Sequence, residues 1–240
     1  MIKIAVPGVK GRMGSAIADQ ILKTTDLQLA LVTVKANDPM VGKKYSNTDL
    51  IITENLQGSE FSVLIDFSSP AAVMQHLCYC LQHNIAMVIG VTGFDEKQLN
   101  QIKQAANKIP ILLSANMSIG VNICYKLLEL AAKLLDNSWK ITISDVHHQH
   151  KKDSPSGTAK QLANVIAAVR GIEPSAIEIN SERRGDVVGE HTVTFSNSVE
   201  TISINHNADT RDIFAIGAIN AARWINHRDP GLYSMLDVIG

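Results

Sequence analysis

The sequence predicts an α/β protein with a doubly wound parallel sheet in its first half and a mixed sheet in its second half. In the first half, short apolar runs alternate with stretches of helical periodicity, which is typical of strands covered by helices on both faces. A glycine-rich turn directly follows the first of these runs. In the second half, strand-like runs follow one another with few helices between them, which favours a mixed or antiparallel sheet. We expect two domains with a boundary near Met117.

The elements of the first half follow from their residue patterns. Continuous apolar runs bounded by polar residues predict four buried strands. Pro70 stands in the first turn of one helix, where its missing N–H is tolerated, and Asp95 is a suitable cap for the next. The expected order is strand 2–6, helix 13–23, strand 27–34, strand 63–66, helix 70–82, strand 85–91 and helix 95–108.

The second half is interpreted in the same way. Ile216, Ile219 and Trp224 lie at helical spacing near the end of the chain. Shorter apolar runs earlier in the second half resemble strands. The expected order is helix 119–136, strand 141–146, helix 157–169, strand 177–181, strand 191–196, strand 201–207 and helix 212–226.

Composition excludes several classes of protein. The chain has 240 residues, of which 45% are hydrophobic, so it can bury an ordinary core. Its 22 basic and 23 acidic residues give a net charge of -1, which provides no reason to expect nucleic acid or a membrane as partner. Cys78, Cys80 and Cys124 are an odd number, so we expect reduced thiols. No signal peptide or membrane span is recognised, and a cytoplasmic location is expected.

A turn with three glycines joins the first strand to the first helix. Gly8, Gly11 and Gly14 are spaced three apart, and such a turn lets a pyrophosphate approach backbone N–H groups at a helix N-terminus. The pattern is G-x-x-G-x-x-G rather than the usual G-x-G-x-x-G, so a plain tight turn remains the alternative. The position directly after the first strand favours a dinucleotide site.

The end of the second strand bears on the choice of dinucleotide. Dinucleotide folds usually carry an acid there that binds the ribose hydroxyls, but this chain has Val34 and Lys35. Lys35 together with Arg12 could bind a 2′-phosphate. We therefore expect NADPH to be used at least as well as NADH. The alternative is that Lys35 is a solvated loop residue.

The segment 147–158 concentrates groups that carry chemistry. His147, His148 and His150 lie beside Lys151, so the loop can donate protons and attract an anionic substrate. We expect no metal, because the neighbouring lysines oppose a cation and metal ligands are usually more widely spaced. A solvated loop is the remaining alternative.

Ser156, Gly157 and Thr158 open the helix that follows this loop. Their hydroxyl and N–H groups can hold a carboxylate or phosphate, although Ser156 could equally be an ordinary helix cap. With the glycine turn, they indicate a pyridine-nucleotide-dependent reductase. Two other hypotheses are a nucleotide-sensing protein without catalysis and a different reductase of the same architecture, such as an aspartate dehydrogenase.

Several motifs closely resemble the family of dihydrodipicolinate reductases, also called 4-hydroxy-tetrahydrodipicolinate reductases, of the bacterial lysine and diaminopimelate pathway. The resemblance covers nearly the whole chain, and the loop from His147 is its most specific part. The chain departs from the commoner family pattern at Val34, where many members have an acid, and at Val91, where threonine is usual. The motifs are Gly8-x-x-Gly-Arg-Met-Gly14, Asp66-Phe-Ser-x-Pro70, Gly90-Val-Thr-Gly93, Asn116-Met-Ser-x-Gly-Val-Asn122, His147-His-x-His-Lys-x-Asp-x-Pro-Ser-Gly-Thr158, Arg184-Gly-x-x-Val-Gly-x-His191 and His206-x-Ala-x-x-Arg211-x-x-Phe-Ala-x-Gly217.

The resemblance implies a complete assignment. A Rossmann-like dinucleotide-binding domain, 1–117 completed by 212–240, would precede a central α+β domain, 118–211, that binds substrate and forms a homotetramer through its sheet. NADPH or NADH would reduce a small cyclic dicarboxylate. His147 would be the general acid/base and Lys151 the proton donor, while His148, Ser156, Gly157 and Thr158 would hold the substrate's carboxylates. The cofactor would contact Gly8, Gly11, Arg12, Met13, Gly90, Val91, Thr92, Ser114, Ala115, Asn116 and Met117, in addition to Lys35.

Overall fold

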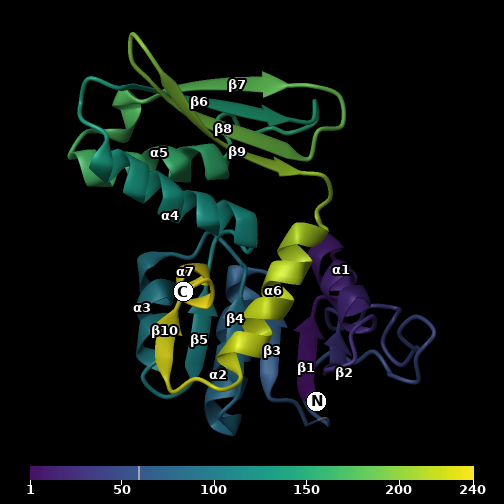
Figure 1. Cartoon of the computed structure of the whole chain (residues 1–240). Helices are drawn as coiled ribbons and strands as arrows, with labels where there is room; N and C mark the ends of the chain where they lie inside the picture. The colour runs from purple at the N-terminus through teal and green to yellow at the C-terminus, as the bar shows by residue number, and fades with distance from the viewer. Residues whose placement is uncertain (59) are drawn as a thin grey trace. The chain divides into compact units, whose positions relative to one another are not determined.

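The structure is a computed structural model that describes residues 1–58 and 60–240. The chain divides into two compact units (Figure 1). The first unit comprises residues 1–117 and 214–240, and the second comprises residues 118–213. Among the helices of these described residues, none is long and apolar enough to cross a bilayer.

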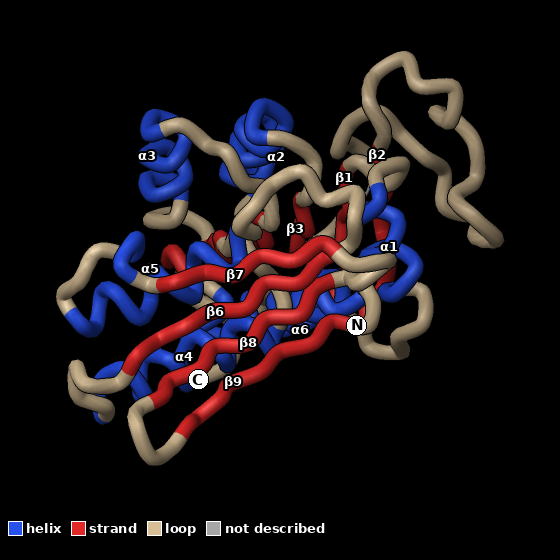
Figure 2. Tube along the Cα trace, turned by 90° about the horizontal axis from the view of Figure 1, so that it is seen from above, coloured by secondary structure: helices blue, strands red, loops and turns tan. Residues whose placement is uncertain are grey.

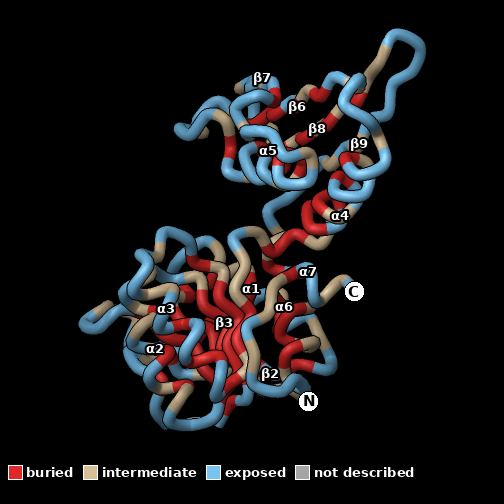
Figure 3. The backbone as a smooth tube through the Cα atoms, turned by 90° about the vertical axis from the view of Figure 1, so that its left-hand side faces the viewer, coloured by how far each residue is buried: buried red, intermediate tan, exposed pale blue. Residues whose placement is uncertain are grey.

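The first unit is built on a six-stranded sheet with the strand order β10-β5-β4-β3-β1-β2. Every pair of neighbouring strands is parallel, which confirms the predicted doubly wound sheet. The central strands are among the most deeply buried parts of the unit (Figure 3). The strands are β1 (Ile2–Pro7), β2 (Leu27–Thr33), β3 (Val63–Asp66), β4 (Ala86–Ile89), β5 (Pro110–Leu113) and β10 (Gly231–Tyr233), and the helices are α1 (Arg12–Ile21), α2 (Pro70–His83), α3 (Glu96–Ala105), α6 (Asp212–Ile225) and α7 (Met235–Val238).

The helices α2 and α3 begin at the proline and aspartate signals that the sequence analysis identified. Pro70 occupies the first turn of α2, and the side chain of Ser69 accepts a hydrogen bond from the N–H of Ala72. Asp95 caps α3 in a reciprocal capping box with Gln98, which confirms its predicted role. The strands β5 and β10 were not predicted. Parallel pairing with a neighbouring strand defines both of them.

The second unit contains a four-stranded sheet in the order β7-β6-β8-β9, whose strands lie side by side in Figure 2. β6 and β7 are parallel, whereas β6–β8 and β8–β9 are antiparallel, so the sheet is mixed as predicted. One face packs against two helices around a core that includes Leu128, Ile143 and Phe195. The elements are α4 (Ile119–Leu134), β6 (Lys140–His147), α5 (Gly157–Arg170), the short 3-10 helix η1 (Pro174–Ala176), β7 (Glu178–Arg183), β8 (Gly189–Ser196) and β9 (Thr201–Ala208).

The register of this sheet brings polar residues together on its helix-covered face. Successive side chains of a strand point to opposite faces, so Asp145 and His147 share the face of the core residue Ile143. Asp145 is the cross-strand partner of His191 on β8, and His191 is the partner of His206 on β9. A row of ionisable residues therefore crosses three strands on the buried side of the sheet.

Candidate active site

The glycine turn at the end of β1 is shaped as an anion cradle. Gly8 has φ +70°, a conformation that favours glycine, and the N–H of Gly11 donates to its carbonyl oxygen at 2.9 Å. A Cβ on Gly14 would lie 2.4 Å from the same oxygen, so only glycine lets α1 approach the turn. The N-cap, Gly11, makes no side-chain hydrogen bond to the helix. Because no side chain caps them, the first N–H groups of α1 suit a pyrophosphate.

The other predicted cofactor residues of the first unit lie at the same edge of the sheet. Lys35 follows β2, the segment 90–92 follows β4, and the segment 114–117 follows β5. The carboxyl ends of parallel strands meet at one edge, which is where doubly wound folds bind dinucleotides. A Cβ on Gly90 would lie 2.2 Å from the ring of Phe67. The absence of a side chain at Gly90 therefore leaves room for this ring at the same edge of the sheet.

The structure adds a carboxylate to this edge that the sequence analysis did not foresee. Val34 and Lys35 carry no acid, but the Asp38 carboxylate lies 2.9 Å from the ammonium group of Lys10 in the glycine turn. The contact with Lys10 and the N–H of Met40 lower the pKa of Asp38. The loop after β2 folds back toward the turn, so the absence of an acid at Val34 and Lys35 does not leave this edge of the sheet without a carboxylate. The expected use of NADPH stays a prediction.

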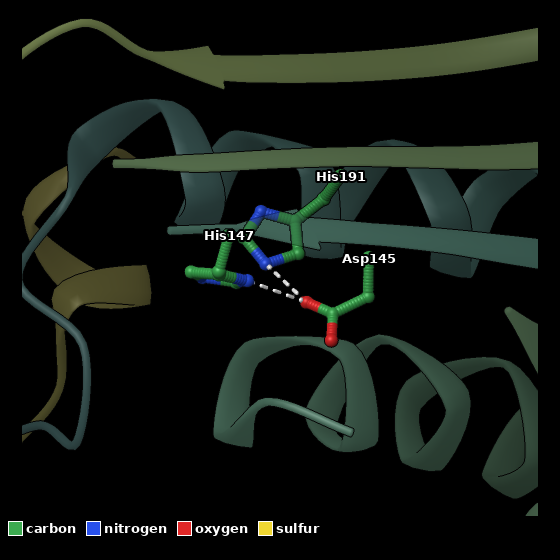
Figure 4. Close-up of side chains that lie close together, drawn as sticks. All are labelled: Asp145, His147 and His191. Atoms are coloured by element: carbon green, nitrogen blue, oxygen red, sulfur yellow. Dashed lines mark ion pairs between the residues drawn. The ribbon is translucent and has the colours of Figure 1, made fainter. Parts of the chain in front are cut away.

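In the second unit, His147 is the last residue of β6 and lies on the strand, not in the loop as predicted. Its Nδ1 lies 3.0 Å from Oδ1 of Asp145, and Nε2 of His191 lies 3.4 Å from the same oxygen (Figure 4). All three residues are buried. A rigid strand therefore holds the predicted acid/base residue beside a carboxylate.

Asp145 is fully buried and remains ionised. Burial by itself would raise its pKa, but contacts with His147, His191 and Ser156 hold the pKa far below the usual range. Its second oxygen accepts hydrogen bonds from the N–H of Ser156 at 3.0 Å and from the hydroxyl of Ser181 at 3.1 Å. Histidine rings and hydrogen-bond donors thus stabilise the negative charge of Asp145.

The predicted substrate residues lie at the start of α5. Ser156 is its N-cap, and its hydroxyl accepts a hydrogen bond from the N–H of Ala159 at 3.1 Å. This oxygen is therefore the ordinary helix cap that the sequence analysis gave as the alternative. Gly157 and Thr158 form the first turn of the helix, where N–H groups point outward. The structure therefore places three of the four predicted substrate residues at one helix N-terminus.

One cation of the loop is paired with a carboxylate, and a histidine of the loop lies beside a further cation. Lys151 lies 2.7 Å from Asp153, and His148 lies 3.4 Å from the guanidinium group of Arg211. Desolvation, together with the positive charge of Arg211, lowers the pKa of His148. At neutral pH His148 is therefore a neutral hydrogen-bonding group, while Lys151 and Arg211 provide the positive charge.

The cluster of Asp145, His147 and His191 is also the one group of potential metal ligands among residues 1–58 and 60–240. Their ligand atoms lie within 4.8 Å of one another. The guanidinium group of Arg183 lies 3.7 Å from Asp145 and opposes a cation there. The predicted absence of a metal stays a prediction.

Sequence reasoning missed Asp145, His191 and Arg211 as members of this site. Asp145 was detectable in principle, because a charged residue two positions from a histidine on a strand shares its face. His191 was not, because it lies on a different strand, β8. The pairing of β6 with β8 could not be deduced from local pattern. Arg211 lies at the end of the segment after β9, and no local signal connects it with His148.

The parallel sheet with its glycine cradle and the second unit with its buried His147 define a dinucleotide-dependent reductase of the Rossmann type. The family model for the N-terminus of dihydrodipicolinate reductase matches residues 2–117, and the model for its C-terminus matches residues 120–239. The chain belongs to the dihydrodipicolinate reductase family, which confirms the resemblance of its motifs.

Individual relatives cover the whole chain. The 4-hydroxy-tetrahydrodipicolinate reductase of Syntrophotalea carbinolica is 39% identical, over 100% of this chain and 99% of the relative. That of Bordetella pertussis is 36% identical, over 99% and 97%. A dipicolinate-bound dihydrodipicolinate reductase from Paenisporosarcina sp. TG-14 has a TM-score of 0.86 at 25% identity over both full chains. An aspartate dehydrogenase from Thermotoga maritima shares the fold, with a TM-score of 0.52 at 10% identity over 95% of this chain and 98% of that chain.

Proposed function

We propose that this protein reduces 4-hydroxy-tetrahydrodipicolinate, or dihydrodipicolinate, to tetrahydrodipicolinate in lysine and diaminopimelate biosynthesis, with NADPH or NADH as reductant. The observation that carries the proposal is the family match, which extends through both units of the chain. Relatives that bear the name of this activity align from end to end. The alternative of another reductase, such as an aspartate dehydrogenase, is supported by the fold alone.

The dinucleotide supplies a hydride when it is bound. The uncapped start of α1 and the turn at Gly8 and Gly11 would hold its pyrophosphate. Arg12 and Lys35 are exposed cations at the same edge of the sheet and would attract a 2′-phosphate, so we expect NADPH to be used at least as well as NADH. The segments 90–92 and 114–117 would line the rest of the cofactor at the ends of β4 and β5.

The substrate would be a small cyclic dicarboxylate. Support comes from the relative described as dipicolinate-bound and from the N–H groups of Gly157 and Thr158 at the start of α5. Lys151 would donate a proton from Nζ as hydride transfer leaves negative charge on the ring, and His147 would act as general acid/base. His148 would donate a hydrogen bond to a carboxylate.

We infer that the protein assembles as a homotetramer through the sheet of the second unit. The face opposite the helices carries small polar side chains, such as Thr192, Thr194 and Ser203, which would contact the sheet of another subunit. Light scattering after gel filtration would test this, with an expected mass of four times 26.1 kDa.

The decisive experiment follows the absorbance of reduced nicotinamide while the unstable substrate is formed in the cuvette from pyruvate and aspartate semialdehyde by the preceding synthase. Parallel reactions with NADPH and NADH give the cofactor preference. Enzyme-dependent oxidation supports the proposed function. Binding of both cofactors without oxidation would contradict it and favour the nucleotide-sensing hypothesis.

A further inference from the structure

We propose that Asp145 is a positioning residue that organises both halves of the substrate site. One of its oxygens determines which ring nitrogen of His147 carries the proton. The other oxygen anchors Ser156 at the start of α5. The proposal rests on the proposed function, because it assigns His147 the role of general acid/base. Neither the glycine turn nor the rest of the first unit enters into it.

The first step concerns the ring of His147. Nδ1 is buried and lies 3.0 Å from Oδ1 of Asp145, and because the contact is not aligned as a hydrogen bond, its attraction is electrostatic. A negative charge at this distance favours the neutral tautomer that carries its proton on Nδ1, and it also stabilises the charged ring. Nε2 then becomes the atom that exchanges a proton with a reacting molecule.

The opposite edge of the ring supports this assignment. A Cβ on Gly189 of β8 would lie 3.1 Å from Nε2 of His147, so the absence of a side chain there leaves room beside this nitrogen. Nδ1 of His147 thus lies beside the carboxylate of Asp145, and Nε2 lies beside Gly189, which has no side chain. This asymmetry is what a general acid/base with a fixed tautomer requires.

The second step concerns the loop that carries Lys151. Oδ2 of Asp145 accepts the N–H of Ser156 at 3.0 Å, which ties the end of β6 to the start of α5. Asp145 is therefore one of the residues that anchor the loop between them. Arg183 supports the same loop, because its guanidinium group donates to the carbonyl of Asp153 and lies 3.7 Å from Asp145.

The charged groups that face Asp145 are few. They are His147 on β6, His191 on β8 and Arg183 on β7, whereas the helix side contributes the N–H of Ser156. Nε2 of His191 lies 3.4 Å from Oδ1 of Asp145 and 3.3 Å from the hydroxyl of Ser156. His191 therefore contacts both the carboxylate oxygen that faces His147 and the N-cap hydroxyl of α5.

The first test needs no variant. In ¹⁵N-labelled protein, the chemical shifts of the ring nitrogens of His147 report which nitrogen carries the proton, and a His147→Gln sample assigns the signals. We expect the Nδ1–H tautomer in the wild type at alkaline pH. An Nε2–H tautomer would overturn the proposal, whether or not the protein reduces the expected substrate.

The second test compares Asp145→Asn, which removes the charge, with Asp145→Glu, which keeps it. In Asp145→Asn we expect kcat to fall by about 10²-fold and the alkaline limb of the pH–kcat profile to move to lower pH. The shift has this sign because the charged ring of His147 loses its neighbouring negative charge. Asp145→Glu should return the limb toward its wild-type position even if the rate recovers only in part.

Asp66→Asn is the matched control. Asp66 is also fully buried and lies 2.6 Å from Nδ1 of a histidine, His76, so its loss should destabilise the protein comparably. Its removal should leave the alkaline limb in place. A folded Asp145→Asn protein with the wild-type pH profile would refute the proposal. An inactive wild type would instead refute the proposed function and leave the tautomer measurement valid.

Discussion

The ammonium group of Lys10 lies 2.9 Å from the carboxylate of Asp38, so a charged pair connects the glycine turn after β1 with the loop after β2. The pair stands at the edge of the sheet where a dinucleotide would bind. The N–H of Asp38 donates to the carbonyl of Lys35 at 3.1 Å, so this acid lies in the same turn as one of the cations expected to attract a 2′-phosphate. We therefore expect the choice between NADPH and NADH to depend on opposing charges.

Asp38→Asn should increase the preference for NADPH. The change removes a negative charge that would repel the 2′-phosphate and releases Lys10 to bind it. We expect the ratio of kcat/KM for NADPH to that for NADH to rise several-fold at low salt, as measured by initial rates. Asp49→Asn breaks a comparable surface pair with Lys44, at 2.6 Å, and serves as control. An unchanged or lower ratio in Asp38→Asn would show that the carboxylate does not face the ribose.

Lys151→Ala and His147→Ala should each lower kcat by about 10²-fold to 10⁴-fold, because each removes a group that transfers a proton. NADPH binding should stay near normal, which fluorescence titration would measure. Lys152→Ala is the matched control, since Lys152 is an exposed neighbour outside the proposed site. Wild-type turnover in both variants would contradict the assignment of these two residues.

Ser156→Ala should have two separable effects. The helix cap is lost, which costs about 1 kcal/mol of stability, and KM for the dicarboxylate should rise. Ser69→Ala removes a cap of the same type from α2 and should reproduce the stability loss without the change in KM. Thermal unfolding and substrate titration of the two variants distinguish the effects. Equal KM values would mean that Ser156 acts as a cap alone.

Gly90→Ala should destabilise the first unit, because the new methyl group would lie 2.2 Å from the ring of Phe67. We expect a loss of about 1–3 kcal/mol in urea unfolding. The same substitution in a Phe67→Ala background should cost much less, since the space beneath the ring is then open. Additive losses in the double variant would show that the ring is not the obstacle.

Acid should remove the stabilising effect of Asp145. Its pKa in the folded protein lies below the value of 3.8 for an unperturbed aspartate, so it contributes stability above that pH. The contribution should be lost as the pH falls below about 3.8, when the unfolded chain takes up the proton. Calorimetry should therefore show a difference between wild type and Asp145→Asn at pH 7 that shrinks in acid. A constant difference would mean that the loss comes from packing.

Most of the fold was accessible from local pattern. The strand 63–66 and the cap at Asp95 were predicted at their observed positions, because apolar runs and capping chemistry act over a few residues. β5 and β10 escaped prediction, and pairing with a neighbouring strand makes each of them part of the sheet.

The sequence by itself determined the glycine turn, the concentration of histidine and lysine residues in the segment 147–158 and membership of a family, since these depend on residue types at fixed spacing. Tertiary structure alone decided that His147 lies on a strand, that His191 shares its carboxylate, and that Asp38 returns to Lys10. The last two are contacts that join residues from different elements or loops. Strand pairing and loop closure create them, and neither leaves a periodic signal in the residues that it brings together.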